Sequence, residues 1–251
     1  MDATVTSAQP ALSIIIPAFN EERRLPRALT LLAQYLDAHP VEAEVIVVDD
    51  ASTDATAAIA YSFRDKFAHL VLLSTGKRNH GKGYAVRMGM LAARGRIALF
   101  TDADLSAPIE ESQKLIAAID GGYDVAFGSR AVNRNLIEVH QSRIREWAGI
   151  LFNKVVQLAT GLRFVDTQCG FKAFAMPQSR IVFEQQRIEG FGFDAEVLFL
   201  AQRHGLRAAE VPVRWAHDPQ TKVRVLRDGL RMVADLFTIR WNALRGRYPR
   251  A

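Results

Sequence analysis

Cysteine is almost absent from this 251-residue chain, which contains Cys169 and no other. An intrachain disulfide is therefore excluded, and a reducing compartment fits the sequence. Neither a second cysteine nor a histidine lies close to Cys169 along the chain, and thiol reactivity needs a neighbour that favours the thiolate. We interpret Cys169 as an inert thiol rather than a nucleophile.

Long hydrophobic runs and targeting signals are also missing. No stretch reaches the roughly 18 consecutive apolar residues that a transmembrane helix needs. The nearest candidate, residues 147–162, is interrupted by Asn153, Lys154 and Gln157. Residues 1–11 have neither the basic start nor the apolar core of a signal peptide, and we expect them to form a disordered arm.

Two common nucleotide-binding fingerprints are absent as well, namely G-x-x-x-x-G-K-[ST] and G-x-G-x-x-G. What remains is an ordinary globular composition, 49% hydrophobic and 24% charged, with enough length for one large domain and a single core. The net charge of +5 is compatible with anionic substrates, nucleic acid or an anionic membrane surface, and it does not distinguish among them.

Apolar, β-branched runs alternate with helical patterns through the first half of the chain. The predicted strands are Leu12–Pro17, Glu44–Asp49, Leu70–Ser74, Arg96–Thr101, Asp124–Gly128 and, later, Ala208–Trp215. The predicted helices between them are Glu22–Ala38, Asp54–Phe67, Gly83–Ala93 and Ile109–Asp120. This alternation predicts an α/β fold whose mostly parallel sheet is covered by helices on both faces.

After Arg130 the pattern changes. An amphipathic helix is predicted over residues 142–162, and a loop rich in glycine and phenylalanine follows at Asp166–Phe174. A helix is predicted at Phe193–His204, and the final one, Val223–Leu244, interleaves apolar residues with arginines. The apolar face of the first of these helices is formed by Trp147, Leu151, Val155, Leu158 and Leu162.

Two carboxylates, Asp102 and Asp104, follow the buried strand that ends at Thr101. In an open α/β sheet the carboxyl ends of the strands are where ligands bind. Two acidic groups there suit a hard divalent cation, which usually sits beside phosphates. The pattern D-x-D is weak by itself, because aspartates also cap helices.

Other predicted strands also end in polar residues. The first ends at Pro17 and is followed by Asn20 and Glu21, and the second ends at Asp49 and Asp50. We interpret Asp49 as a ligand-binding residue. For Ser52 and Asp54, which follow, capping of the next helix is an equally good interpretation.

Cationic groups are expected at the same edge. The stretch from Lys77 to Tyr84 places Gly81 and Lys82 at the start of a helix, where the main chain can approach a pyrophosphate. Arg130 follows the fifth strand and suits forked phosphate recognition, with a surface ion pair as the alternative. Acidic groups, a metal and cations at one edge describe a site for a nucleotide diphosphate.

In this order and spacing the motifs resemble those of family 2 glycosyltransferases, which have the GT-A fold of the nucleotide-diphospho-sugar transferases. The motifs of the first half, within residues 12–130, are IIIPAFNEE, VIVVDDASTDAT, NHGKGYAVRMGM, TDADLS and AFGSR. Those of the second half are DTQCGFKAF (166–174), FGFDAEVLFLAQRHG (191–205) and AEVPVRW (209–215). The second group is similar to the dolichyl-phosphate β-glucosyltransferases and their bacterial polyprenyl-phosphate relatives.

The resemblance implies roles for particular residues. Around the nucleotide sugar it places Pro17, Ala18, Asn20, Glu21, Asp49, Asp50, Gly81, Lys82, Asp102 and Ala103. It gives catalytic roles to Asp104, Arg130, Gln168, Lys172 and Asp194, and Gln168 and Lys172 belong to a loop that closes on donor and acceptor. The acceptor-phosphate candidates are Arg130, Arg143, Arg145 and Lys172.

The same resemblance implies that Asp102 and Asp104 hold Mg²⁺ or Mn²⁺ on the donor diphosphate, with Ser106 nearby. Asp194 and Glu196 occupy positions where many relatives have a catalytic carboxylate. Glu196 falls within an apolar helix, so the alternative is that it anchors a basic residue of a loop.

The implied reaction is inverting transfer of a hexose, most simply glucose from UDP-glucose, to a polyprenyl or dolichyl monophosphate. Asp104-Leu105-Ser106 is closer to the mannosyl-phosphate branch, so a GDP-mannose-dependent mannosyltransferase stays an alternative, as does a soluble or protein acceptor. A nucleotidyltransferase is disfavoured because the acidic PAFNEE stands where its basic glycine-rich loop belongs. Binding of nucleic acid is disfavoured because phosphate backbones want cations, not paired aspartates.

A lipid acceptor demands access to a membrane surface. We expect residues 12–222 to form the GT-A domain and residues 223–251 a basic amphipathic helix that contacts a membrane, with residues 142–162 as a second candidate. The alternatives are that both apolar stripes pack on the domain or form a contact between copies of the chain. The expected location is cytoplasmic, peripheral at the inner face of the cytoplasmic membrane.

Overall fold

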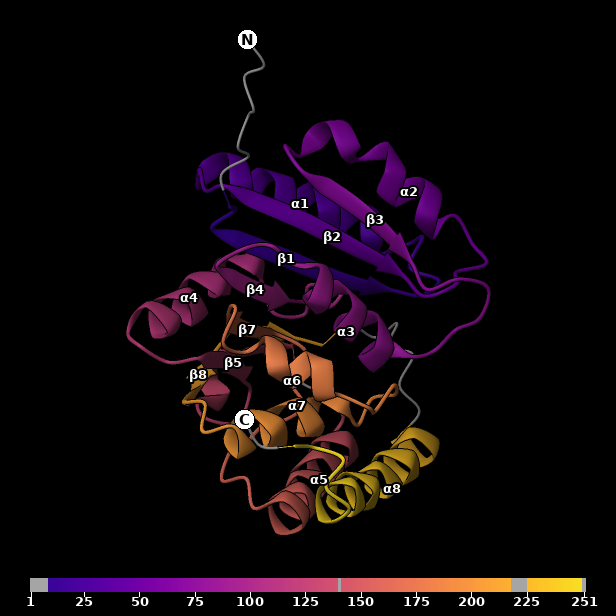
Figure 1. Cartoon of the computed structure of the whole chain (residues 1–251). Helices are drawn as coiled ribbons and strands as arrows, with labels where there is room; N and C mark the ends of the chain where they lie inside the picture. The colour runs from indigo at the N-terminus through magenta and orange to yellow at the C-terminus, as the bar shows by residue number, and fades with distance from the viewer. Residues whose placement is uncertain (1–8, 140, 218–224, 250–251) are drawn as a thin grey trace.

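The central sheet has the strand order β3-β2-β1-β4-β7-β5-β8 in a computed structural model that describes residues 9–139, 141–217 and 225–249 (Figure 1). The strands are β1 (Leu12–Ala18), β2 (Ala43–Asp49), β3 (Leu70–Ser74), β4 (Ile97–Phe100), β5 (Val125–Ser129), β6 (Ile137–Val139), β7 (Lys172–Ala175), β8 (Ala208–Pro212) and β9 (Trp215–Ala216). The α-helices are α1 (Leu25–Ala38), α2 (Thr56–Ser62), α3 (Lys82–Ala92), α4 (Ser112–Asp120), α5 (Arg143–Thr160), α6 (Arg180–Gln185), α7 (Phe193–Arg203) and α8 (Val225–Leu244). Single 3₁₀ turns lie at Arg64–Lys66, Ile109–Glu111 and Arg134–Leu136.

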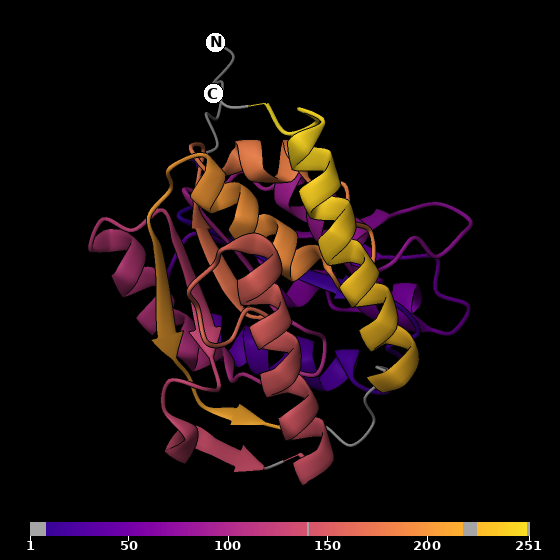
Figure 2. The ribbon, with the colours of Figure 1, turned by 90° about the horizontal axis from the view of Figure 1, so that it is seen from below.

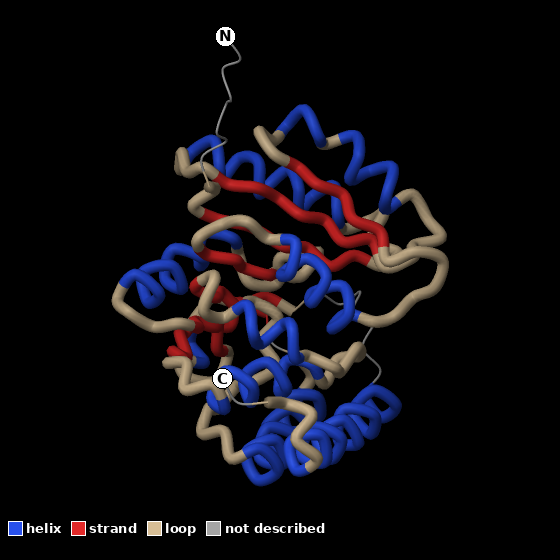
Figure 3. The backbone as a smooth tube through the Cα atoms, viewed as in Figure 1, coloured by secondary structure: helices blue, strands red, loops and turns tan. Residues whose placement is uncertain are grey.

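Helices cover both faces of the sheet, as predicted (Figure 3). Alternate residues of β1 face opposite sides, so Ile15 packs among residues of α3, α6 and α7, whereas Ile14 and Ile16 pack among residues of α1 and α4. Every residue of β1 is buried, which is the requirement that a strand covered on both faces imposes on its sequence. The two helical layers hold the carboxyl ends of β1, β2 and β4 at one edge.

The strand β7 corrects the prediction of a loop over Asp166–Phe174. Residues Lys172–Ala175 run antiparallel to both β4 and β5 and separate them in the sheet. The segment is four residues long and begins with a lysine, so it lacks the β-branched run by which the other strands were recognised. Its position brings the second half of the chain directly beside the strand that carries the paired aspartates.

Several other boundaries also differ from the predictions. The first helix begins at Leu25 rather than Glu22, because residues 21–24 form a turn in which the Glu21 carbonyl accepts from the Arg24 and Leu25 N–H groups. The second helix ends at Ser62, and the helix expected from Ile109 begins with a 3₁₀ turn. The strand expected over Ala208–Trp215 ends at Pro212, and Trp215–Ala216 pairs instead with β6 in a separate two-stranded sheet.

The helices α5 and α8 lie side by side, away from the edge formed by β3 and β2 (Figures 1 and 2). The apolar stripe predicted on α5 is turned mostly outward: Trp147 is 71%, Leu151 68% and Leu158 87% exposed. Leu230 and Phe237 of α8 are likewise 73% and 71% exposed. The predicted stripe on α5 is therefore divided: its three residues named above are exposed, whereas Leu162 is buried and Val155 packs against the core.

No helix in the described residues is both long and apolar enough to span a membrane. The predicted arm lies mostly outside these residues, although Pro10 and Ala11 are already bonded to the body, with the Pro10 carbonyl accepting from the Arg96 N–H. Residues 223 and 224 of the predicted C-terminal helix also lie outside them.

Candidate active site

The paired aspartates lie directly after β4, at the expected edge of the sheet. Asp102 Oδ1 is 2.5 Å from Nζ of Lys82, the first residue of α3. The carboxylate of Asp104 accepts a hydrogen bond from the main-chain N–H of Ser106 at 2.9 Å, and Arg24 Nη1 is 3.7 Å from its other oxygen. Two adjacent carboxylates are thus flanked by cations on both sides.

The charges of this cluster are strongly coupled. Burial raises the pKa of Asp104 above its ordinary value, and the charge of Asp102 raises it further. Burial alone would lower the pKa of Lys82, but Asp102 and Asp194 outweigh burial and hold that pKa above its ordinary value. Lys82 therefore stays protonated, while Asp104 remains in a surplus of negative charge that a further cation would relieve.

A divalent metal fits this donor set. Magnesium is typically held by one or two carboxylates together with substrate phosphates and water, and Asp102 and Asp104 supply such a pair. Among the described residues, no group of three or more His, Cys, Asp or Glu side chains is arranged to hold a metal. The residues present therefore suit an ion that arrives with a diphosphate rather than an ion in a cage made by the protein alone.

Unusual backbone conformations gather at the same edge. In the described part of the chain, the non-glycine residues with positive φ are Asn20 (53°), Ala51 (59°) and Leu105 (48°), which follow β1, β2 and β4. Such conformations are uncommon outside glycine and cluster at functional sites, where the surrounding structure sustains them. Their coincidence with the paired aspartates supports a ligand site at this edge.

Asp50 holds the turn that precedes α3. Its carboxylate accepts hydrogen bonds from the N–H groups of His80 and Gly81, at 3.0 and 2.7 Å, and from the side-chain amide of Asn79 at 2.8 Å. Gly81 has a φ of 116°, and a Cβ there would lie 2.6 Å from the carbonyl oxygen of Glu189. Asp50 and the glycine together fix the start of α3 at the site.

The other polar residues predicted around the nucleotide bind the turns between β1 and α2. Asp49 Oδ1 accepts from the Ser52 N–H at 3.1 Å, and Asn20 Oδ1 accepts from the Thr53 N–H at 2.8 Å. The Ser52 hydroxyl accepts from the Asn20 N–H, so it does not cap α2, whereas Asp54 accepts from the N–H of the first residue of that helix. The N-cap residue of α2 is Ala55, so neither Ser52 nor Asp54 is its cap, although Asp54 bonds the first turn of the helix.

Glu21 is turned to Arg24, whose Nε and Nη2 donate to its two carboxylate oxygens at 2.6 and 2.5 Å. Arg24 in turn approaches Asp104, so Glu21 is linked to the paired aspartates through Arg24. Pro17, Ala18 and Ala103 are buried at the strand ends and have no polar side-chain atoms, so their predicted contact with a nucleotide stays a prediction.

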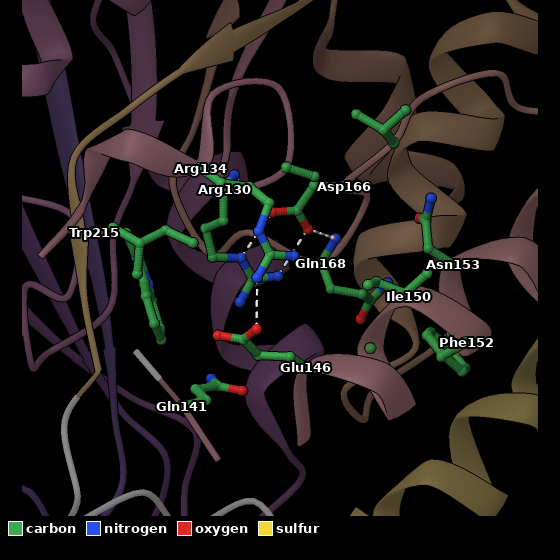
Figure 4. A pocket seen from close by; sticks show the side chains of 14 residues that line it. Arg130, Arg134, Gln141, Glu146, Ile150, Phe152, Asn153, Asp166, Gln168 and Trp215 are labelled. Carbon is green, nitrogen blue, oxygen red and sulfur yellow. Dashed lines mark hydrogen bonds and ion pairs between the residues drawn. The ribbon is translucent and has the colours of Figure 1, made fainter. Parts of the chain in front are cut away.

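Arg130 is braced by a carboxylate that the sequence analysis left unassigned. Its Nε and Nη2 donate to the two oxygens of Asp166, each at 2.7 Å, and its Cζ lies 5.4 Å from the centre of the Trp215 ring (Figure 4). Burial alone would raise the pKa of Asp166, but Arg130 lowers it below its ordinary value. Glu210 fixes Asp166 by accepting from its N–H at 2.7 Å, so the arginine is held rigidly at the edge.

A pocket of about 140 Å³ opens beside Arg130, between β9 and α5 (Figure 4). Its walls are mostly apolar and include Ile137, Ile150 and Trp215. Gln168, from the predicted closing loop, lines the pocket with Arg130. The pocket therefore combines Arg130, which is ion-paired with Asp166, with walls that are mostly apolar.

The side chain of Lys172 is 0% exposed, so it lies inside the protein rather than at the surface of the site. Its Nζ donates to Asp194 Oδ1 at 2.5 Å and to the Cys169 carbonyl at 2.6 Å, and it lies over the rings of Phe100 and Phe127. The predicted contact of Lys172 with an acceptor phosphate would require this ion pair to separate. In the observed arrangement Lys172 and Asp194 hold the loop before β7 in place.

Gly170 brings that loop against the paired aspartates. A Cβ at this position would lie 2.3 Å from Asp102 Oδ2 and 2.8 Å from Lys82 Nζ. The two halves of the site, separated in sequence, are therefore in direct contact at Gly170.

Glu196 serves the fold, and it anchors the basic residue Arg187 of a loop through its main chain, in agreement with the alternative interpretation. It is fully buried and accepts hydrogen bonds from the N–H groups of Arg187 and Ile188, at 3.0 and 2.8 Å. The hydroxyl of Tyr248 donates to its other oxygen at 2.5 Å.

Cys169 is also buried, and burial raises the pKa of its thiol to about 12. This confirms the interpretation of an inert thiol. The side chains of Arg143 and Arg145 lie outside the described part of the structure, and their role with an acceptor stays a prediction.

Sequence reasoning missed Asp166 and Arg24 as members of the site. Asp166 opens the DTQCGFKAF motif, but no local pattern pairs it with an arginine 36 residues earlier. Arg24 stands three residues after Glu21, a spacing that could have indicated the ion pair.

The fold defined here is shared with solved nucleotide-sugar enzymes. Glucosyl-3-phosphoglycerate synthase from Mycobacterium tuberculosis, solved with Mn²⁺, UDP and glucosyl-3-phosphoglycerate, has a TM-score of 0.64 at 19% identity, covering 97% of this chain and 82% of that one. Mannosyl-3-phosphoglycerate synthase from Rubrobacter xylanophilus has a TM-score of 0.66 at 21% identity, covering 95% and 76%. The expected GT-A fold is confirmed.

Sequence comparison is more specific. The glycosyl transferase family 2 profile matches residues 13–176. The dolichyl-phosphate β-glucosyltransferase of Drosophila melanogaster is 38% identical over 242 residues, 91% of this chain and 74% of that protein. The Saccharomyces cerevisiae protein of the same name is 34% identical over 257 residues, 94% of this chain and 76% of that protein. The chain belongs to glycosyl transferase family 2.

Proposed function

We propose that this protein transfers glucose from UDP-glucose to a polyprenyl or dolichyl monophosphate, with inversion at the anomeric carbon. The observation that carries the proposal is the division of the site into a carboxylate pair with Lys82 and a pocket with Arg130, both at one edge of the sheet. The names of the relatives supply the sugar and the acceptor class, and UDP in complexes of proteins with this fold is consistent with the nucleotide.

We assign Asp102 and Asp104 as the ligands of Mg²⁺ or Mn²⁺, ions with which neighbours in fold have been solved. The ion, when bound, would offset negative charge on the departing UDP. Lys82 is placed for the same task, because its Nζ is already beside Asp102 and stays protonated. The start of α3 lies beside the carboxylate pair through Lys82, and the N-terminus of a helix favours a diphosphate.

The acceptor needs little activation. A phosphate monoester has a second pKa near ~6 and is largely ionised at neutral pH, so a general base is dispensable. Arg130 would hold the acceptor phosphate and the apolar walls of its pocket the first part of the lipid. The bidentate contact with Asp166 orients the guanidinium toward this role.

The donor and acceptor are tested together by following a radiolabel. The protein is incubated with labelled UDP-glucose or GDP-mannose, a polyprenyl phosphate and Mg²⁺, and the organic phase is counted. We expect the label to enter the organic phase when the donor is UDP-glucose and not when it is GDP-mannose. Label from GDP-mannose would instead favour the mannosyltransferase, and label remaining in the aqueous phase as a new glycoside would favour a soluble acceptor.

We further propose that α5 and α8 present a membrane-facing surface to reach the lipid. Exposed apolar side chains, with Leu230, Phe237 and Trp241 on α8, lie on this surface. Exposed arginines also lie on α8 or directly after it, namely Arg227, Arg231, Arg240 and Arg245. Apolar side chains beside arginines suit an anionic lipid surface.

Point substitutions test this surface without disturbing the fold. Truncation would not, because Leu236 and Ile239 of α8 belong to the core. Substituting Leu230, Phe237 and Trp241 together by glutamine is expected to lower flotation with anionic liposomes by at least about tenfold, since each apolar side chain contributes on the order of 2 kcal/mol. Tyr61→Gln, at a side chain 62% exposed on α2, is the control.

Undiminished flotation of the triple variant would refute the membrane surface. Concentration-dependent self-association that is lost in the triple variant, with no liposome binding by the unchanged protein, would assign the surface to a contact between copies of the chain.

A further inference from the structure

The end of the chain is fixed in the core by a tyrosine. Tyr248 is 0% exposed and packs edge-on against Phe199 of α7. Its hydroxyl donates to Glu196 at 2.5 Å and accepts from the side-chain amide of Asn242 at 3.2 Å. Arg203 holds the main-chain carbonyl of Tyr248 at 3.0 Å.

Glu196 connects this tyrosine to the loop between α6 and α7, residues 186–192. The same carboxylate that accepts from Tyr248 also accepts from the N–H groups of Arg187 and Ile188. Because Glu196 is buried, these donors stabilise its carboxylate in place of water. When one donor is lost, only the remaining donors stabilise the negative charge.

The helix α8 supports the other end of the same loop. Asp235 accepts a hydrogen bond from the main-chain N–H of Gly192, and a Cβ on Gly192 would lie 2.5 Å from Asp235 Oδ2. The C-terminal segment, residues 225–249, therefore contacts the loop directly at Gly192 and through Glu196 at Arg187 and Ile188.

The loop in turn supports the first turn of α3. The Glu189 carbonyl accepts from the Tyr84 N–H at 3.1 Å, and the Gln186 side chain donates to the Gly83 carbonyl at 2.8 Å. A Cβ on Gly83 would lie 2.6 Å from the Ile188 carbonyl oxygen. Gly81 and Gly83, which flank Lys82, both lie against carbonyl groups of this loop, so the position of the loop fixes the main chain of Lys82.

We infer that Tyr248 and Glu196 are positioning residues for the donor diphosphate, acting through loop 186–192 on Lys82 and the start of α3. The inference rests on the proposed function for the identity of the ligand. It makes the C-terminal segment part of the donor site, in addition to any contact with lipid. Residues 225–249 and the first turn of α3 are thereby coupled through loop 186–192.

The variant Tyr248→Phe tests the inference, since it removes the hydroxyl and keeps the ring. The matched control is Tyr35→Phe, which removes another buried hydroxyl, bonded to Ser112 at 3.1 Å on the other face of the sheet. Hydrogen exchange of the protein without ligand is followed for peptides covering residues 82–86 and 187–192. We expect Tyr248→Phe to speed exchange in both by about threefold or more, the equivalent of a net hydrogen bond, and Tyr35→Phe to change neither.

Binding and kinetics give readouts that a general loss of stability would not produce. The Kd for UDP with Mn²⁺ and the KM for the nucleotide sugar should rise by about three- to tenfold in Tyr248→Phe. The KM for the lipid phosphate should stay unchanged. Glu196→Gln, which keeps the volume but loses an acceptor, should show the same split with a larger rise.

Unchanged exchange at residues 82–86 in Tyr248→Phe, or equal effects in Tyr35→Phe, would overturn the inference. Faster exchange there in a protein that binds no UDP would support the positioning role and overturn the proposed donor instead. The two hypotheses thus fail separately.

Discussion

The variant Asp104→Ala is expected to lower hexose transfer by at least about a hundredfold in the presence of Mg²⁺ or Mn²⁺. Asp104 and Asp102 form the whole carboxylate donor set at the strand end, and loss of one electrostatic contact to a developing charge has an effect of this size in other enzymes. Asp37→Ala, at an exposed carboxylate on α1, is the control and should retain full activity.

The same variant separates loss of metal from loss of fold. Burial and the charge of Asp102 already raise the pKa of Asp104, so its removal relieves repulsion and the Tm of the protein alone should not fall. Mn²⁺ with UDP should raise the Tm of the unchanged protein, because a ligand that binds the folded state stabilises it. Asp104→Ala should lose most of that shift. Unchanged turnover in Asp104→Ala would contradict the metal assignment.

The parallel part of the sheet was predictable because its signals are local. The run Val45–Val48 and similar apolar runs predict strands buried on both faces of the sheet. The helical patterns between these runs predict that helices connect the strands. The strand β7 gave no such signal. Its four residues become a strand because β4 and β5 present open edges on either side, a tertiary effect that no window of sequence contains.

The candidate site follows the same division. Asp102, Lys82 and Arg130 were placed at one edge from their positions after strands or before a helix. The partners that orient them were not: Asp166 meets Arg130 across 36 residues, and Tyr248 meets Glu196 across 52. Such pairings depend on the packing of α7, β7 and α8, so a pattern of residue types cannot indicate them.

The apolar pattern of α8 does not indicate which of its apolar side chains are buried and which are exposed. Leu230, Phe237 and Trp241 are exposed on this helix, whereas Leu236 and Ile239, which lie between them in the sequence, are packed in the core. The helix therefore has two apolar sides, one packed in the core and one exposed. The outward stripe thus adds to the argument for a membrane or a partner, because the fold does not need it.

Lys172→Met is expected to reduce the free energy of unfolding by about 3–5 kcal/mol, as measured by urea denaturation. The substitution keeps most of the volume but leaves the carboxylate of Asp194, 3% exposed, without the ammonium at 2.5 Å. Lys114→Met is the matched control. That lysine is half-exposed, and its partner Glu111 keeps Arg214, so the change should be within about 1 kcal/mol.

The double variant Lys172→Met/Asp194→Leu distinguishes a buried ion pair from a residue needed only for packing. Removing both charges eliminates the unpaired carboxylate, and replacement of buried ion pairs by apolar residues is often neutral. The double variant should therefore be more stable than Lys172→Met alone, although Lys82 then has Asp102 as its remaining close partner. Additive losses would show that Lys172 and Asp194 stabilise the fold independently. Restored stability without restored transfer would instead show that the pair is kept for the geometry of the loop that brings Gly170 against Asp102.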